Sequence, residues 1–187
     1  MKMMIMLLPV LAAFPLSGQD LVLSDYAAGL PQAQGWKWES FADRVMGGKS
    51  DLTPPAVADT AEGPALVLAG KVVTKGGGFI QVRLKAEAPK FDASAYAGVE
   101  VVVSAPAGGN YFVFLRNQDT FFPWSYYGSP LDASPDKRTV RIPWSAFGAQ
   151  SVGRKQFRPD RLTSVALVAA FKDFDPNLKI YRVALYR

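Results

Sequence analysis

The chain has 187 residues, 49% of them hydrophobic and 12% aromatic, and its 21 basic and 16 acidic residues give a formal net charge of +5. This length and this apolar content suffice for one self-supporting hydrophobic core and exclude a mainly disordered chain. Cysteine and histidine are both absent, which excludes disulfides, thiolate zinc sites, thiol nucleophiles and Ser-His-Asp triads.

The N-terminal segment, residues 1–18, is predicted to be a removable export signal. Lys2 supplies a short positive start, residues 3–14 are uncharged and apolar, and residues 15–19 are small or polar. An apolar run of this length is short for a membrane anchor and is typical of a signal peptide. We expect cleavage near Gly18, a periplasmic or secreted protein, and a single domain over residues 19–187.

Beyond residue 18, apolar and polar side chains alternate in short segments that Gly, Pro, Asp and Asn separate. A period of two is typical of β-strands, and no long period of 3.6 residues is present. Strands are predicted over residues 66–73, 79–85, 99–103, 111–116, 139–142, 164–171 and 178–186. Because no helices are predicted between them, we expect an all-β fold, an antiparallel jelly-roll β-sandwich.

Two aromatic segments stand out within this pattern. Trp36 and Trp38 are two residues apart, so they are expected to face one side of an extended segment and to fill the core. Residues 121–128 are the richest aromatic stretch and are predicted to be a loop. This loop either folds over the core or presents a stacking platform for a sugar or a peptide, with Trp124, Tyr126 and Tyr127 as candidate binding residues.

The C-terminal part of the chain is basic. Residues 137–187 hold 11 basic and 3 acidic residues, whereas residues 19–136 hold 9 and 13. The densest basic cluster consists of Arg154, Lys155, Arg158 and Arg161. It is interpreted either as a solvated face or as a contact for an anionic lipid headgroup, glycan or protein surface. No nucleic acid partner is expected, because the chain has no aromatic-basic RNA motif.

Two glycine clusters mark the first half of the chain: residues 43–50, with the sequence DRVMGGKS, and residues 76–79, with the sequence GGGF. Each alone is typical of a tight turn or a bulge. Neither has the spacing and the following helix of a phosphate-binding loop.

Together, the two clusters, Gly70, Arg83, Tyr111, Arg116 and the segment 142–147 resemble the complex I intermediate-associated protein 30 family, from about residue 36 to the C-terminus. The resemblance implies a galactose-binding-domain-like jelly roll. The best-known members of the family are mitochondrial assembly factors for respiratory complex I, which implies a protein partner. The motif residues taken as candidate binding residues are Asp43, Met46, Gly47, Gly48, Ser50, Arg83 and Arg116.

Arg83 and Arg116 allow two interpretations. Each lies on a predicted strand with apolar neighbours, so we expect at least one of them over a concave sheet surface. A guanidinium there is suited to bind a carboxylate or a pair of sugar hydroxyls. The alternative is a structural ion pair, for example with Asp43.

Three functions are weighed. The first is an exported, non-catalytic module that binds a protein partner during assembly. The second is a carbohydrate-binding module that uses Trp124, Tyr126 and Tyr127. The third is an enzyme that uses carboxylates such as Asp43, Glu39 or Asp119, which is disfavoured because histidine is absent and no close carboxylate pair is evident. We therefore predict a binding module, not an enzyme, with no metal and no cofactor.

Overall fold

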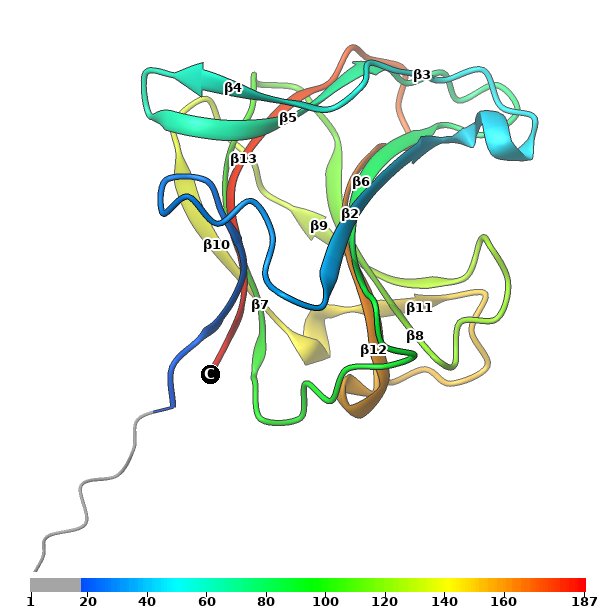
Figure 1. Ribbon diagram of the computed structural model, residues 1–187. Coiled ribbons are helices and arrows are strands. Elements are labelled where there is room, and N and C mark those ends of the chain that lie inside the picture. Colours follow the sequence, from blue (N-terminus) through cyan, green and yellow to red (C-terminus); the bar gives the residue numbers. More distant parts are fainter. Residues whose placement is uncertain (1–17) are drawn as a thin grey trace, which may run out of the picture.

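The computed structural model describes residues 18–187, so the predicted signal peptide lies almost entirely outside the described residues. These residues form two antiparallel sheets packed face to face (Figure 1), which confirms the predicted all-β sandwich. Within the described part of the chain, no helix has the length and apolar character that a membrane crossing requires.

The first sheet has seven strands and includes both ends of the described chain. Its main path runs β10-β7-β13-β5-β3, with β1 paired to β13 and β4 paired to β5. Its strands are β1 (Leu21–Asp25), β3 (Asp51–Leu52), β4 (Ala56–Thr60), β5 (Gly63–Lys71), β7 (Gly98–Ser104), β10 (Arg138–Pro143) and β13 (Asn177–Tyr186).

The second sheet has six strands in the order β11-β9-β8-β12-β6-β2. Its strands are β2 (Trp36–Ala42), β6 (Phe79–Ala86), β8 (Tyr111–Asn117), β9 (Tyr126–Leu131), β11 (Gly148–Gln150) and β12 (Leu162–Ala170). Three short 3-10 helices connect strands: η1 (Asp43–Met46), η2 (Trp144–Ala146) and η3 (Pro159–Arg161). The sheet curves, and its concave side faces away from the core (Figure 1).

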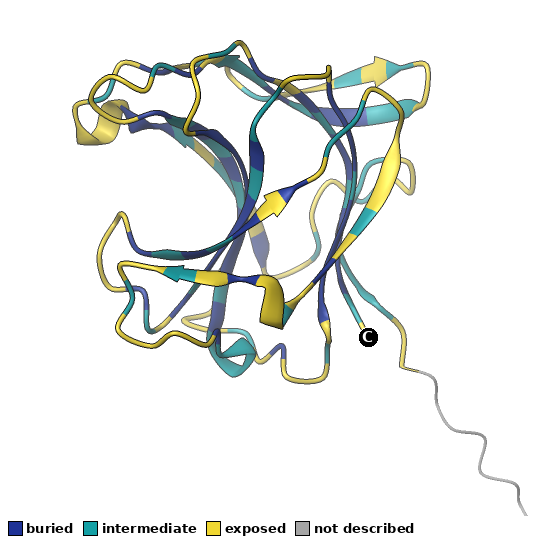
Figure 2. Ribbon diagram, turned by 180° about the vertical axis from the view of Figure 1, so that it is seen from behind, coloured by how far each residue is buried: buried dark blue, intermediate teal, exposed yellow. Residues whose placement is uncertain are grey.

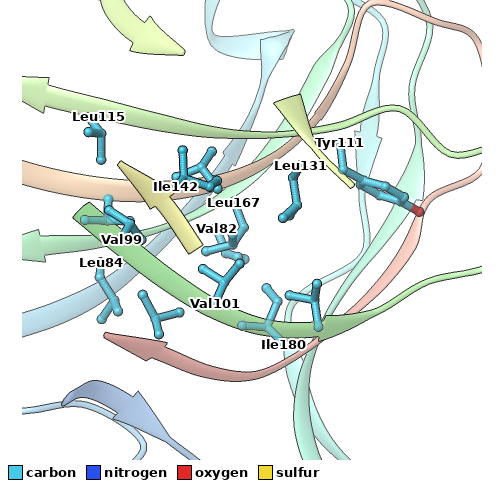
Figure 3. Close-up of a cluster of buried hydrophobic side chains, with 14 of the residues drawn as sticks. Val82, Leu84, Val99, Val101, Tyr111, Leu115, Leu131, Ile142, Leu167 and Ile180 are labelled. Atoms are coloured by element: carbon cyan, nitrogen blue, oxygen red, sulfur yellow. The ribbon is translucent and has the colours of Figure 1, made fainter. Parts of the chain in front are cut away.

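The hydrophobic core fills the space between the two sheets. Alternate residues of each strand point into it, as the period of two requires, and Figure 3 shows Leu84 and Leu167 of one sheet near Val101 and Ile180 of the other. All four side chains are fully buried. Trp36 is buried, which confirms that it fills the core, and Trp38 is partly buried against the same cluster.

All seven predicted strands are present, and six further strands were not predicted. The prediction that residues 121–128 are one loop was wrong, because β9 begins at Tyr126. Its residues pair with β8, with Phe114 opposite Gly128 and Leu115 opposite Tyr127. The aromatic side chains of this stretch therefore alternate between the two faces of a sheet.

Candidate functional site

A groove lies on the concave outer face of the six-stranded sheet, with a volume of about 210 Å³. Its aromatic lining residues are Phe41, Phe79, Phe114, Trp124, Tyr126 and Phe171. Its other lining residues are Met46, Gly77, Gln81, Arg83, Arg116, Pro123, Ser125, Ser164 and Ala166. They come from five strands and four connections, so the site exists only in the folded chain. Figure 1 shows η1 and the loop between β8 and β9 on opposite rims.

The groove is deep over the central strand β12 because β12 carries small side chains there. Ala166 lies in register with Phe114 of β8, and Ala170 lies in register with Phe79 of β6. Together with Val168, these residues form a second apolar cluster, separate from the core. Every residue of β12 except Thr163 is buried, although its outer face forms the floor of the groove. Figure 2 shows the curved sheet from behind, coloured by burial.

The wall on the β9 side is a pair of stacked rings. The rings of Phe114 and Tyr126 lie parallel, with their centroids 3.8 Å apart and an interplanar angle of 12°. Gly128 makes the stack possible, because a Cβ there would lie 3.0 Å from Tyr126 and 3.1 Å from Phe114. Burial against this wall raises the pKa of the Tyr126 hydroxyl, so Tyr126 stays a neutral ring over the physiological range.

Large apolar side chains stand exposed around the rim. Met46, Trp124 and Phe171 are 45%, 54% and 56% exposed. Phe122 extends the rim by stacking on Trp124 with an interplanar angle of 7°. Such a concentration of exposed apolar side chains around a concavity is typical of a binding surface.

Phe171 sits on this rim in a strained backbone conformation. Its φ is +63°, in the left-handed region that bulky residues avoid. Its N–H donates to the Gly78 carbonyl at 3.0 Å, and its ring makes an edge contact with Phe112 at 5.1 Å. This backbone conformation directs the aromatic ring toward the groove. Residues with strained backbones cluster at binding sites.

The two glycine clusters form one structure around the Asp43 carboxylate. Asp43 is fully buried. Its Oδ1 accepts the Ser50 N–H at 2.9 Å, and its Oδ2 accepts the Ser50 hydroxyl at 2.7 Å and the Gly78 N–H at 2.5 Å. A Cβ on Gly48 would overlap this carboxylate, and one on Gly77 would lie 2.6 Å from Oδ2. The motif residues therefore pin the two loops together.

This arrangement divides the candidate residues of the first cluster. Asp43 and Ser50 are buried and engaged with each other, and Gly48 is required for close approach. Gly47, with a φ of +87°, ends η1. Met46 is the one of these five that lines the groove. The motif thus positions Met46 and holds the rim.

Arg116 holds the opposite rim. Its Nη2 donates to the carbonyls of Thr120 and Phe122 at 2.9 and 2.8 Å, and its Nη1 donates to that of Pro123 at 3.2 Å. The fork geometry of a guanidinium suits this clamp. Burial and the charge of Arg83 lower the pKa of Arg116.

Arg83 lies on the floor beside β2. It forms an ion pair with Glu39, the residue opposite it on β2. The ion pair with Asp43, which was the example given from the sequence, is not formed. Its guanidinium also covers the Phe41 ring, 4.8 Å from the centroid. Both predicted arginines therefore lie over the concave sheet, as expected, and both already have partners within the chain.

Tyr127 does not belong to the groove, and its selection as a binding residue was wrong. As the neighbour of Tyr126 on a strand it faces the opposite side, where it is fully buried. Its hydroxyl donates to the Arg154 carbonyl at 2.9 Å, and its ring contacts Phe157. The structure thus brings together Met46, Arg83, Arg116, Trp124 and Tyr126 of the predicted set.

The basic cluster of the C-terminal part lies away from the groove, and three of its members have acidic neighbours. Arg154 and Arg161 each lie 3.8 Å from Asp119, and Arg158 lies 2.9 Å from Asp160. These contacts favour the interpretation of the cluster as a partly neutralised surface.

Comparison with known proteins places the chain in context. The family model of complex I intermediate-associated protein 30 matches residues 31–180. No curated protein matches the chain.

Two of the similar solved structures are carbohydrate-binding modules of Clostridium thermocellum. The family 11 module, solved with a β-1,3-1,4-mixed-linked tetrasaccharide, has a TM-score of 0.64 and 10% identity, with 89% of this chain and 95% of that chain covered. The family 30 module of a cellulosomal cellulase has a TM-score of 0.59 and 14% identity, with 89% and 96% covered. At these identities the likeness establishes the jelly-roll fold alone.

Proposed function

Because the chain belongs to the complex I intermediate-associated protein 30 family, we propose that it is a non-catalytic binding domain that holds an apolar segment of a protein partner in the groove. One observation carries the proposal: Met46, Trp124 and Phe171 stand half-exposed around a groove with mainly apolar lining. Aromatic and methionine side chains are enriched in protein interfaces, and aromatic residues often dominate the affinity. The family's description supports an accessory role in assembling a protein complex.

The carboxylates weighed for catalysis support a non-catalytic function. Asp43 is buried among donors from its own chain, Glu39 pairs with Arg83, and Asp119 lies beside Arg154 and Arg161. None of these three lines the groove. A general acid or base needs to reach its substrate, and these groups are committed elsewhere.

Site-specific photo-crosslinking in the source cells tests the protein partner. A Met46→p-benzoylphenylalanine variant is expected to give a discrete crosslinked product. The same residue introduced at Val57, exposed on β4 of the other sheet, is the matched control and is expected to give none. With the captured partner purified, Trp124→Ala is expected to weaken binding at least tenfold and Val57→Ala to leave it unchanged. Equal crosslinking from both positions would contradict the proposal.

A carbohydrate is the second candidate ligand. The flat Phe122–Trp124 stack is exposed on the rim, and such a surface also suits the face of a sugar ring. The solved neighbours, one of them with a bound tetrasaccharide, support this reading at the level of the fold. Retardation of the protein in gels containing mixed-linked glucan, lost in Trp124→Ala, would replace the protein partner with a glycan.

Export through residues 1–18 remains part of the proposal. N-terminal sequencing of the protein recovered from the periplasm or the medium is expected to begin near Gln19. Recovery of the uncleaved chain from the cytosol would contradict export and leave the groove's proposed role open to the crosslinking test.

A further inference from the structure

One end of the groove runs into a group of basic side chains on the same face of the sheet. Lys37 of β2 lies in register with Lys85 of β6, Lys85 with Ser164 of β12, and Ser164 with Arg116 of β8. Arg83 lies two residues from Lys85 and therefore points to the same face. Four cations from β2, β6 and β8 thus lie on the concave face, with Ser164 of β12 between them.

A second hollow, of about 250 Å³, opens among these side chains. It is lined by Arg83, Lys85, Arg116, Thr163 and Ser164. Arg83, Arg116 and Ser164 also line the apolar groove. The two concavities therefore adjoin and share part of their walls, and one is mainly apolar while the other is lined by basic side chains.

The basic side chains are only partly neutralised within residues 18–187. Glu39 is shared, because it pairs with Arg83 and lies 3.5 Å from Lys85. Arg116 makes no ion pair in this range and donates instead to neutral oxygens of its own loop. Cations directly opposed on neighbouring strands, as Lys37 and Lys85 are, destabilise a sheet. An anion bound between these strands would relieve the repulsion.

We infer that the basic hollow binds the carboxylate of an aspartate or glutamate side chain of the protein partner, while the partner's neighbouring apolar side chains occupy the groove. The inference rests on the proposed function and names the chemistry of the segment that binds. The positive charge of the hollow favours a carboxylate as the ligand. The adjoining apolar groove favours a peptide segment in which the acidic residue has apolar neighbours. The lining of the groove is mainly apolar, and apolar side chains match it better than an acidic glycan does, because the edges of the glycan's rings carry hydroxyls and carboxylates.

Selection from a random peptide display library tests this inference with the mature chain. Wild-type protein is expected to enrich peptides that combine an acidic residue with aromatic or aliphatic neighbours. The double variant Lys37→Gln/Lys85→Gln removes one exposed charge that lines the hollow and one beside it on β2. Lys71→Gln/Lys90→Gln removes two exposed charges elsewhere as the matched control. An enriched peptide is expected to bind the first variant about tenfold more weakly and the control unchanged.

Two further measurements complete the test. Replacing the acidic residue of the enriched peptide by its amide is expected to weaken binding to wild type about tenfold but to change binding to Lys37→Gln/Lys85→Gln far less. Added salt is expected to weaken the wild-type interaction, because the charges are partly exposed. Circular dichroism of each variant confirms that it is folded.

Three outcomes would overturn the inference, and they are distinguishable. Enrichment of apolar peptides without an acidic residue would be consistent with the proposed function and would contradict the binding of a carboxylate in the basic hollow. If the wild-type protein enriches no peptides beyond those enriched by the Trp124→Ala variant, the groove does not bind peptides and the proposed function itself is contradicted. Binding of polygalacturonate in place of any peptide, lost in Lys37→Gln/Lys85→Gln, would assign the anion to a glycan.

Discussion

At the scale of the residue, the contacts of Asp43 explain why most residues of the two glycine clusters are needed. Its carboxylate accepts hydrogen bonds from Ser50 and Gly78, and Gly48 and Gly77 leave room for it. The motif is therefore a device for joining two loops around one buried charge. Of the first glycine cluster, residues 43–50, Met46 is the residue that lines the groove.

Asp43→Asn is expected to destabilise the fold. The amide group of asparagine would turn one acceptor into a donor against the donors of Ser50 and Gly78, at a cost of about 3 kcal/mol in the free energy of unfolding. Urea denaturation followed by circular dichroism measures this change. Asp59→Asn, at an exposed position of β4, is the control and is expected to change stability by less than about 0.5 kcal/mol.

Phe171→Gly is expected to separate stability from binding. Glycine relieves the strain of the positive φ, about 1–2 kcal/mol, which offsets the lost contact with Phe112, so stability should change by less than about 1 kcal/mol. Binding to the partner should fall with the loss of the ring. Phe174→Gly removes a ring that packs against Tyr111 at 5.6 Å and has no positive φ. If the two variants lose equal stability in urea titrations, Phe171 is not strained in the way described.

At the scale of the element, one side chain makes the largest number of hydrogen bonds to the backbone of the loop between β8 and β9. The Arg116 guanidinium joins three carbonyls of this loop, and the loop carries Phe122 and Trp124 to the rim. The loop is thus held by the charged fork together with its own turn hydrogen bonds, such as those of Thr120 to Asn117 and of Ser125 to Phe122.

Arg116→Lys is expected to loosen this loop locally. A single ammonium group cannot reach all the carbonyls that the planar fork reaches, so amide hydrogen exchange over residues 120–125 should accelerate about tenfold. The global free energy of unfolding should fall by about 1 kcal/mol. Arg138→Lys, at a surface ion pair with Asp132, is the control and should leave exchange in the loop unchanged. Uniform acceleration across both sheets would argue against a local clamp.

The sequence predicted the strands whose two faces differ or whose residues are mostly β-branched. It did not predict β9, because Tyr126 and Tyr127 continue an aromatic run and nothing local marks where the loop ends. The edge strand β4 was also missed, since Ala56, Ala58 and Asp59 have low strand propensity and pairing with β5 decides their conformation.

The candidate site was predictable only in part. Met46, Arg83, Arg116, Trp124 and Tyr126 were selected and do line one groove. Phe79, Phe114 and Ala166 were not selected, because an apolar residue on the outer face of a strand looks like a core residue until the register is known. Phe171 had no sequence signal at all, since its importance lies in its φ of +63°.

At the scale of the whole molecule, the absence of histidine and cysteine shapes the dependence of stability on pH. Hydrogen bonds to Glu62 from the Tyr181 hydroxyl and the Lys137 N–H lower its pKa, and hydrogen bonds to Asp173 from Thr74 lower its pKa. Groups with a lowered folded pKa stabilise the fold above their unfolded pKa and lose that contribution as the pH falls.

The free energy of unfolding is therefore expected to be flat between about pH 6 and 8, where no side chain of ordinary pKa titrates. It should decrease as the pH falls below about 4.5, as Glu62 and Asp173 become protonated. Chemical denaturation at a series of pH values measures this profile. A Glu62→Gln variant should show a weaker decrease, and a loss of wild-type stability between pH 8 and 6 would contradict the assignment.

The two ends of the described chain meet on the sheet that does not carry the groove. Leu21 of β1 lies in register with Leu185 of β13, and the Arg187 N–H donates to Asp20 at 3.0 Å. A tether attached to either end therefore leads away from the concave face. The domain can therefore be anchored, fused or immobilised through the ends of residues 18–187 while the groove stays unobstructed.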